Sequence, residues 1–347
     1  MNVSYCNRAA GFQKSFPTSK RATIRMRACS ATVQEDPSTS FSLPTLKILY
    51  NDGAYVVVDK PRGMYVHPPE DRNRLIPKHE NGMYLLKQQL GGDYYIYPLH
   101  RIDRATSGVV VYALSSKAAS EFGTAMRARA VHKVYYAFVR GYTDTTGVID
   151  DGMGGQEAVT LYETIMRVNL PMQVGRNQFP TQRYSLVRAV PLTGRYHQIR
   201  RHFNYISHPI VGDGDHGDRF HNRKFANDLD IPGMFLRAAS ISFKTLSGQT
   251  ISVASPASEW EPRWQAIFSA AGACPLVSGA SLLPPPSQLA TLYHEGEDQD
   301  VEGSSKADTR NQQETGFACL RGWQPGFCEP LPLLGELPSL KLDGSCS

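Results

Sequence analysis

Residues 109–114, VVVYAL, form a continuous apolar run, and this run constrains the fold more than any other stretch of the chain. A short run of this kind, bounded by turn residues, predicts a strand that is buried on both faces within a sheet. It directly follows the polar segment HRIDRATSG (100–108), which ends in the turn-like Thr-Ser-Gly. Asp103 is therefore predicted to lie on a loop leading into a packed sheet, a common position for functional side chains.

Asp103 stands between Arg101 and Arg104, so a plain surface ion pair, worth about 0–1 kcal/mol, is the first alternative. The order His-Arg-x-Asp also resembles a protein-kinase catalytic loop, and VVVDK (56–60) supplies a lysine on a strand. A kinase needs the Asp directly after the Arg, an Asn five residues later, a Gly-rich loop and an Asp-Phe-Gly. The chain has none of these, so a kinase is excluded. Two interpretations of Asp103 stay open: a functional carboxylate on a loop and a plain surface ion pair.

Further strand and helix patterns extend through residues 46–268. LKILY (46–50) and AYVVVDK (54–60) predict a hairpin around Asp52-Gly53. Other strands are expected at 131–141, 181–192, 235–244 and 249–255, and a long loop at 68–81. Helices are expected after a cap at Ser115 or Ser116, at 195–206 and at 260–268. Because there is no regular βαβ alternation, the pattern predicts an α+β fold with a mixed, largely antiparallel central sheet and flanking helices and loops.

The two ends of the chain differ from this core. Residues 1–34 contain six basic residues and no acid, and RMRACSA (25–31) resembles a chloroplast processing site. Residues 1–40 are therefore predicted to be a disordered transit peptide for plastids, with mitochondria as the alternative. Residues 275–347 are Pro/Ser-rich and then acidic, which predicts a disordered, low-complexity tail. The catalytic domain is expected at 41–274.

The cysteines also separate the core from the ends. All six lie outside residues 41–270: Cys6, Cys29, Cys274, Cys319, Cys328 and Cys346. The core is thus expected to have no disulfide, no thiol nucleophile and no Cys-ligated zinc, which excludes the zinc deaminases. No metal site is predicted. No run of eighteen apolar residues occurs, so no membrane-spanning segment is predicted.

Basic and aromatic residues are interleaved in the core. RYHQIRRHF (195–203) and KVYY (133–136) carry most of them, with further arginines at Arg127, Arg129, Arg183 and Arg188. This combination is what a polyanion with stackable bases requires, although a solvated basic face is the alternative. GDGDHG (212–217) matches G-x-G-x-x-G, but Asp213 and Asp215 would repel a pyrophosphate and no βαβ unit surrounds it. A dinucleotide site is excluded.

Four ordered segments resemble the motifs of RluA-type RNA pseudouridine synthases. They are ILYNDGAYVVVDKPRGMYVH (48–67), HRIDRATSGVVVYAL (100–114), HKVYYAFVRG (132–141) and TGRYHQIRRHFNYISHPIVGD (193–213), and the resemblance covers about residues 45–270. VHPPEDRN and GDGDHGDRFHNR are most similar to the tRNA pseudouridine synthase C branch. The resemblance implies the pseudouridine synthase fold with an RNA-binding cleft across the sheet.

The resemblance also implies an activity. Such an isomerase detaches a specific uracil from its ribose in structured RNA, turns it and rejoins it through C5 instead of N1, with no cofactor. We expect tRNA as the substrate, organellar rRNA as the alternative, and a monomer. A non-catalytic RNA-binding or chaperone relative is a further alternative, but the motif Asp, Tyr and Arg are all present in this chain.

The resemblance assigns roles to individual residues. Asp103 is the expected catalytic carboxylate, as a nucleophile or a base at the sugar. Arg200 is expected to pair with Asp103 and keep it ionised. Tyr135 is expected to stack on the extracted base near the C5 proton. The expected substrate-binding residues are Arg101, Arg104, Lys133, Arg195, His197 and Leu236.

Two of these assignments carry further expectations. Arg101 and Arg104 would hold phosphates and fill the place of the flipped base, whose extraction costs a few kcal/mol. Leu236 would line an apolar pocket. The family usually has His after this Leu, whereas this chain has Arg237, so a departure is expected at the pocket floor.

Overall fold

A computed structural model describes residues 43–69, 75–92, 95–176, 179–245 and 247–271. The predicted transit peptide and tail lie outside the described residues and stay predictions. No helix in the described part of the chain is long and apolar enough to cross a membrane.

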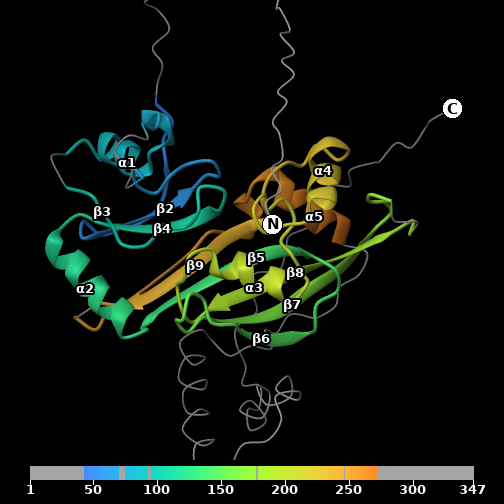
Figure 1. The fold of residues 1–347 in the computed structure, drawn as a ribbon. Coiled ribbons are helices and arrows are strands. Elements are labelled where there is room, and N and C mark those ends of the chain that lie inside the picture. The colour runs from blue at the N-terminus through green and yellow to red at the C-terminus, as the bar shows by residue number, and fades with distance from the viewer. Residues whose placement is uncertain (1–42, 70–74, 93–94, 177–178, 246, 272–347) are drawn as a thin grey trace, which may run out of the picture. The chain divides into compact units, whose positions relative to one another are not determined.

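A ten-stranded sheet forms the centre of the described chain (Figure 1). Its main order is β1-β2-β4-β9-β5-β8-β7-β6, while β10 pairs with β9 and β3 with β4. The β4–β9 pair is parallel and the other pairs are antiparallel. The predicted α+β fold with a mixed, largely antiparallel sheet is confirmed. The strands are β1 (Lys47–Asn51), β2 (Tyr55–Lys60), β3 (Tyr97–Pro98), β4 (Ser107–Ala113), β5 (Val131–Arg140), β6 (Thr146–Asp150), β7 (Val159–Leu170), β8 (Gln182–Pro191), β9 (Leu236–Lys244) and β10 (Thr250–Ala254).

Helices flank this sheet (Figure 1). They are α1 (Gly82–Leu90), α2 (Ser116–Arg127), α3 (Gln198–Tyr205), α4 (Arg219–Asn227) and α5 (Pro262–Ala271), with 3-10 turns η1 (Lys78–Glu80) and η2 (Ala257–Glu259). Ser115 caps α2 as predicted, because its side chain accepts a hydrogen bond from the backbone of Ala118. Within the loop predicted at 68–81, η1 occupies Lys78–Glu80. The helix predicted at 195–206 begins at Gln198, since His197 has a left-handed backbone.

The β4 strand is buried along its whole length, which explains its continuous apolar sequence. Val109 and Val111 pack in one apolar cluster with Phe122 of α2, whereas Val110 and Tyr112 pack in another. Alternate side chains of a strand point to opposite faces, so both faces must be apolar when both are covered. The predicted two-sided burial is confirmed.

Gly108 fixes where β4 begins. Its φ is +112°, and a Cβ at this position would lie 2.0 Å from the Ala238 carbonyl oxygen of β9. Only glycine combines this backbone conformation with such a close approach. Ser107 and Gly108 thus belong to β4 and not to the predicted turn, which lies at residues 104–105. The close approach of Gly108 to β9 sets the position of the Asp103 loop just before the strand.

Candidate active site

Gln198 anchors the start of α3 to the sheet. It is buried; its Oε1 accepts a hydrogen bond from Thr193 (2.7 Å) and its Nε2 donates to the Val159 carbonyl (2.9 Å). One turn later, the wholly buried His202 lies 2.9 Å from the Thr160 hydroxyl. These bonds to β7 orient the first turn of α3, which carries Arg200.

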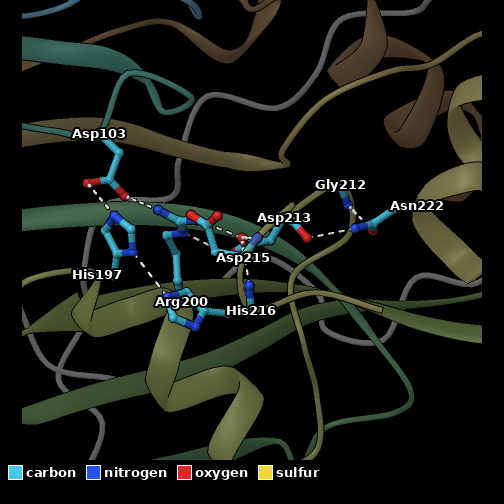
Figure 2. A network of polar contacts seen from close by, with 8 residues as sticks. All are labelled: Asp103, His197, Arg200, Gly212, Asp213, Asp215, His216 and Asn222. Carbon is cyan, nitrogen blue, oxygen red and sulfur yellow. Dashed lines mark hydrogen bonds and ion pairs between the residues drawn. The ribbon is translucent and has the colours of Figure 1, made fainter. Parts of the chain in front are cut away.

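Arg200 is bound to three carboxylates (Figure 2). Its Nη1 donates to Asp103 Oδ2 at 3.0 Å, while Nε and Nη2 form a bidentate pair with Asp213, both at 2.7 Å. Nη2 also donates to Asp215 at 2.6 Å. A bidentate pair fixes the plane of the guanidinium. Asp213 therefore sets the direction in which Arg200 meets Asp103, and the expected Arg200–Asp103 pair is present.

The charges of this cluster stabilise each other. Burial alone would lower the pKa of the Arg200 guanidinium, but the bonds and charge of Asp213, then those of Asp215 and Asp103, raise it. Burial likewise opposes ionisation of Asp213, but hydrogen bonds from Arg200 and from the backbone of His216 lower the pKa of this carboxyl. Arg200 and Asp213 thus stay charged although they are buried.

Lys60 binds backbone carbonyls at the end of the Asp103 loop and in the turn after β2. Its fully buried Nζ donates to the carbonyls of Pro61 (3.0 Å) and Met64 (2.8 Å), and it lies 3.5 Å from that of Arg104. Burial lowers the pKa of Lys60 to about 7. The Gly63 N–H also donates to the Arg104 carbonyl (2.8 Å). The residue after Asp103 is therefore tied to the turn that follows β2.

His197 is a second side chain of the α3 region that faces Asp103. Its backbone is left-handed, with φ 54° and ψ 27°. Its Nε2 is 3.8 Å from Asp103 Oδ1, and its Nδ1 is 3.0 Å from His216 Nε2 (Figure 2). The Tyr196 ring stacks on it, with the ring centres 3.7 Å apart. Burial lowers the pKa of His197 below its ordinary value although the charge of Asp103 raises it, and the charges of Arg200 and His216 act with burial.

An inner cavity of about 250 Å³ opens beside Asp103. It brings together every predicted site residue except Arg104; its lining includes Arg101, Asp103, Lys133, Tyr135, Arg195, His197, Arg200 and Leu236. Tyr135 is buried, and burial followed by the charge of Asp103 raises the pKa of its phenol. The Tyr135 hydroxyl is therefore protonated at neutral pH and has a hydrogen to donate.

A wider outer cleft of about 990 Å³ adjoins the inner cavity and shares Asp103, His197 and Arg200 with it. Basic and aromatic side chains line this cleft; they are Arg62, Tyr65, His67, Arg101, Arg104 and Tyr196. Arg104 lies here, paired with Glu80 at 2.8 Å and over the ring of Tyr65. Arg101 is exposed and has no ion-pair partner among the described residues.

Part of the predicted basic surface is wrong. Arg188 is buried and pairs with Glu163 of β7 at 3.1 Å, so it does not belong to an open groove. His202, on the segment expected to be a basic face, is wholly buried as described above. Both residues form hydrogen bonds or ion pairs with buried polar groups inside the fold. The sequence pattern does not show which residues have such buried partners.

The departure at Arg237 lies outside the inner cavity. Leu236 lines the cavity, but Arg237 is not among its lining residues. Arg237 is 3% exposed and pairs with Asp59 and Glu261. Neighbouring residues of a strand point to opposite faces of the sheet. The change from His to Arg at position 237 therefore does not alter the cavity floor, where Leu236 is present.

Three residues of the site were not predicted: Asp213, Asp215 and His216. All belong to GDGDHG, a segment that excluded a dinucleotide site and carried part of the family resemblance, but whose acids and histidine were assigned no role. Gly212 brings this segment close to the rest of the fold, because its φ is +78° and a Cβ there would lie 1.9 Å from the Gly233 carbonyl oxygen. Two acids beside glycines in a basic region were the available signal, but no local rule pairs them with Arg200.

The fold and the site together define a class: a mixed-sheet enzyme with one arginine-held carboxylate over a small cavity and a basic, aromatic cleft beside it. A family model described as RNA pseudouridylate synthase matches residues 54–205. The chain is 40% identical over 216 residues to tRNA pseudouridine synthase C of Vibrio parahaemolyticus, covering 57% of this chain and 84% of that protein. The corresponding protein of Haemophilus influenzae is also 40% identical over 216 residues, with 57% and 87% covered.

A solved structure supports the fold alone. Human RNA Pseudouridylate Synthase Domain Containing 1 aligns with a TM-score of 0.51 at 21% identity and covers 77% of this chain and 98% of that chain. From the sequence matches, the chain belongs to the RluA-type RNA pseudouridine synthases and is an isomerase that acts on RNA.

Proposed function

We propose that this pseudouridine synthase modifies a uridine in tRNA, with Asp103 as the catalytic carboxylate and the target base flipped into the inner cavity. One observation carries the proposal. Asp103 gives Oδ2 to Arg200, whereas its Oδ1 accepts no hydrogen bond from any described residue. That oxygen borders the cavity and is available to a ribose.

Arg200 makes Asp103 suitable for this role. The carboxylate keeps 28% of its side chain exposed, while the arginine that holds it is 5% exposed and fixed by Asp213. A positioned carboxylate can attack a sugar carbon or remove a proton from the sugar. Both mechanisms need the same free oxygen, and both agree with this geometry.

Tyr135 and Leu236 suit the target base. Both line the inner cavity and both are buried. A uracil ring in this cavity would stack on the aromatic face of Tyr135 and receive the packing of Leu236. The protonated Tyr135 hydroxyl would donate a hydrogen bond to the base. Base flipping is expected because a stacked uridine cannot enter a cavity of this kind.

The outer cleft suits the RNA around the target. Arg62, Arg101 and Arg104 supply positive charge for phosphates, and Tyr65 and Tyr196 supply rings for stacking. Tyr196 has 67% of its surface exposed in this cleft, so its ring is accessible to a base. The choice of tRNA rests on the relatives, which are named tRNA pseudouridine synthase C.

The test is pseudouridine mapping on defined RNA. The purified chain is incubated with a pool of unmodified tRNA transcripts and, separately, with organellar rRNA transcripts, and products are mapped by carbodiimide labelling. We expect one modified uridine in tRNA and none with Asp103→Asn, which keeps the shape but is neither a nucleophile nor a base. Modification of rRNA only would correct the substrate. Activity of Asp103→Asn within tenfold of wild type would refute the catalytic role.

We also propose that residues 1–40 direct import into plastids. The support is their basic, acid-free start and the RMRACSA segment. A fusion of residues 1–40 to a fluorescent protein should enter plastids; fluorescence in mitochondria would favour the alternative, and cytosolic fluorescence would refute targeting.

A further inference from the structure

We propose that His197 accepts the proton that leaves C5 of the target uracil, and that His216 passes a proton on to solvent. This inference rests on the proposed function. It adds two residues to the reaction and gives a use to the GDGDHG segment beyond the positioning of Arg200.

The reaction requires a proton acceptor near C5. When the N1–C1′ bond breaks, its electron pair stays on N1, which then takes a proton from water. The C5=C6 electron pair forms the new C5–C1′ bond. The C5–H electron pair restores the C5=C6 double bond, and the C5 proton must leave to a base. No oxidant or cofactor enters this balance.

Two of the candidate acceptors that line the inner cavity are unsuitable, and a third, Lys133, is left to the experiment below. Tyr135 has its pKa raised by burial, so its phenol already carries a proton at neutral pH. His100 accepts a hydrogen bond from the Val111 N–H at Nε2 (3.2 Å), so its lone pair is occupied and Nδ1 carries the hydrogen. Burial and then Lys133 lower the pKa of His100 to about 3, which makes it a very weak base.

His197 has the geometry of an acceptor. It lines both the inner cavity and the outer cleft, and Nε2 points toward Asp103, the residue that acts on the ribose of the same nucleotide. An acceptor here is adjacent to the reacting nucleotide, because Nε2 lies 3.8 Å from Asp103 Oδ1, the oxygen that is available to the ribose.

The bond between the two histidines makes the acceptor a relay. Of the two facing nitrogens, His197 Nδ1 and His216 Nε2, one carries the bridging hydrogen and the other accepts it. With that hydrogen on His197, the Nε2 of His197 is free to take a proton from the substrate. The bridging hydrogen then moves to His216, so the pair holds only one added charge at any time.

The second ring nitrogen of His216, Nδ1, is the atom from which the proton would leave to solvent. It has no protein partner among the described residues, and His216 is only partly buried. A proton can therefore leave from Nδ1 of His216 to water. The neighbouring Asp215, with 66% of its side chain exposed, keeps this side of the loop polar.

Charged groups on every element around His197 determine its working pH range. Asp103 on the loop before β4 and Asp215 on the loop before α4 favour the imidazolium, whereas Arg200 on α3 and His216 oppose it, and burial opposes it most. The neutral ring is the active form. Activity should therefore fall as the pH is lowered through the reduced pKa of His197, which lies below the ordinary value of about 6.5.

The left-handed backbone at His197 determines which variants are informative. Asparagine and glycine tolerate positive φ better than other residues, so His197→Asn and His197→Gly avoid added strain. Asparagine occupies the site but does not accept a proton. Glycine leaves a space that free imidazole can enter. Both variants are compared with His79→Asn, which changes an exposed histidine outside both cavities.

The experiment measures single-turnover pseudouridine formation in a tRNA transcript that the wild-type protein modifies, made with either hydrogen or deuterium at C5 of uridine. We expect His197→Asn to be slower by about 10²–10⁴-fold, with a larger isotope effect than wild type, because C5 proton loss becomes the slowest step. Imidazole should restore part of the rate of His197→Gly. His79→Asn should match wild type in rate and RNA binding, and the melting temperature should be retained in all variants.

His216 is tested by a pair of variants. His216→Gln keeps a hydrogen-bonding group for His197 but does not transfer a proton, whereas His216→Phe removes both. A relay predicts that both variants are slowed equally, by about tenfold, and that the acid limb of the His216→Phe pH profile moves to higher pH. Full activity in His216→Gln would show that the residue acts only as a structural partner, and would overturn the relay.

Lys133 is the rival acceptor, because burial lowers its pKa as well. If Lys133→Gln shows the enlarged isotope effect and His197→Asn does not, the assignment to His197 is overturned. An unchanged isotope effect and a rate within tenfold of wild type in His197→Asn would also overturn it. If the wild-type protein modifies no transcript, the proposed function itself fails, and that outcome is visible before any variant is measured.

Discussion

Two buried arginines, Arg200 on α3 and Arg237 on β9, use the same ion-pair chemistry, and their surroundings differ. Arg237 is 3% exposed, and its partners Asp59 and Glu261 are mostly covered. The Trp260 ring covers it, with its centre 5.2 Å from the guanidinium carbon, and the hydroxyls of Ser107 and Ser255 bind it. Arg200 is equally buried, but Asp103 and Asp215 extend from it into the inner cavity and the outer cleft.

The charge balance of the two clusters differs as well. At Arg237 a second arginine, Arg263, lies 3.5 Å from Glu261, so two cations face the two carboxylates of Asp59 and Glu261. Arg200 alone faces three carboxylates. The Arg237 cluster is balanced in charge, although it too borders a cavity, of about 240 Å³. The Arg200 cluster instead carries surplus negative charge beside the inner cavity and the outer cleft, where a carboxylate must act. Burial of an arginine therefore does not distinguish a structural from a catalytic role, and neither does partner exposure alone, because Glu261 and Asp103 both keep 28% of their side chains exposed. The number of carboxylates that each arginine holds does differ.

Arg200→Met should have the largest effect, because it affects both stability and catalysis. The fully buried Asp213 would lose its cation, and leaving one charge of a buried pair uncompensated costs about 3–5 kcal/mol of folding free energy. Asp103 would lose its orientation, and product formation should fall by at least about 10³-fold. Urea unfolding and pseudouridine formation measure the two effects, and Arg183→Met, at an exposed arginine, is the control. A stable, active variant would contradict both roles.

Arg237→Met should affect stability alone. The buried carboxylate of Asp59 and the nearby Glu261 would lose their main cation, again at a cost of about 3–5 kcal/mol. Because Arg237 does not line the inner cavity, turnover per folded molecule should stay within about fivefold of wild type at temperatures well below the transition. Thermal unfolding and activity at 10 °C test this. A loss of turnover in the folded variant would show that the two clusters are not separate.

The sequence predicted the elements whose pattern is local. The β1–β2 hairpin, the doubly buried β4 and the Ser115 cap of α2 follow from apolar periodicity and capping rules. The β7 strand, VTLYETIMRVNL, was missed because Glu163 interrupts its apolar pattern. That glutamate is buried against Arg188 of the neighbouring strand, which is 25 residues further along the chain. A polar residue with a distant partner looks the same in sequence as a solvated one.

The site shows the same limit. Asp103, Tyr135 and Arg200 were found through family motifs, and the inner cavity brings them together. Asp213 and His216 were missed because their loop reaches Arg200 only through tertiary contacts, such as the 2.6 Å bond from the Gly212 N–H to Asn222. The start of α3 was misplaced because the left-handed backbone of His197 is not evident from its residue type.

Asp213→Asn should have an intermediate effect and tests how far Arg200 depends on its support. Asparagine has nearly the same shape, but its amide replaces one of the two oxygens that bind the guanidinium. A lost hydrogen bond to a charged group costs about 1.5–3 kcal/mol, which should appear in urea unfolding. Arg200 would also be less precisely placed, and a small misplacement near the reacting atoms costs up to about 10²-fold in rate. Wild-type turnover in this variant would show that Asp103 alone orients Arg200.

Asp215→Asn should have the smallest effect and sharpens the distinction between the carboxylates of Arg200. Asp215 is 66% exposed, and an exposed ion pair contributes little to stability, so the unfolding curve should be unchanged. The residue lines the outer cleft, where its negative charge opposes phosphates. Removing the charge should tighten tRNA binding a few-fold at 50 mM salt, and this gain should shrink at 300 mM salt as screening increases. The measurement is the tRNA affinity of wild type and Asp215→Asn at both salt concentrations. A different result would be unchanged tRNA binding at both salt concentrations together with a fall in turnover like that of Asp213→Asn. In that case Asp215 orients Arg200 together with Asp213, and its negative charge does not act on the bound RNA.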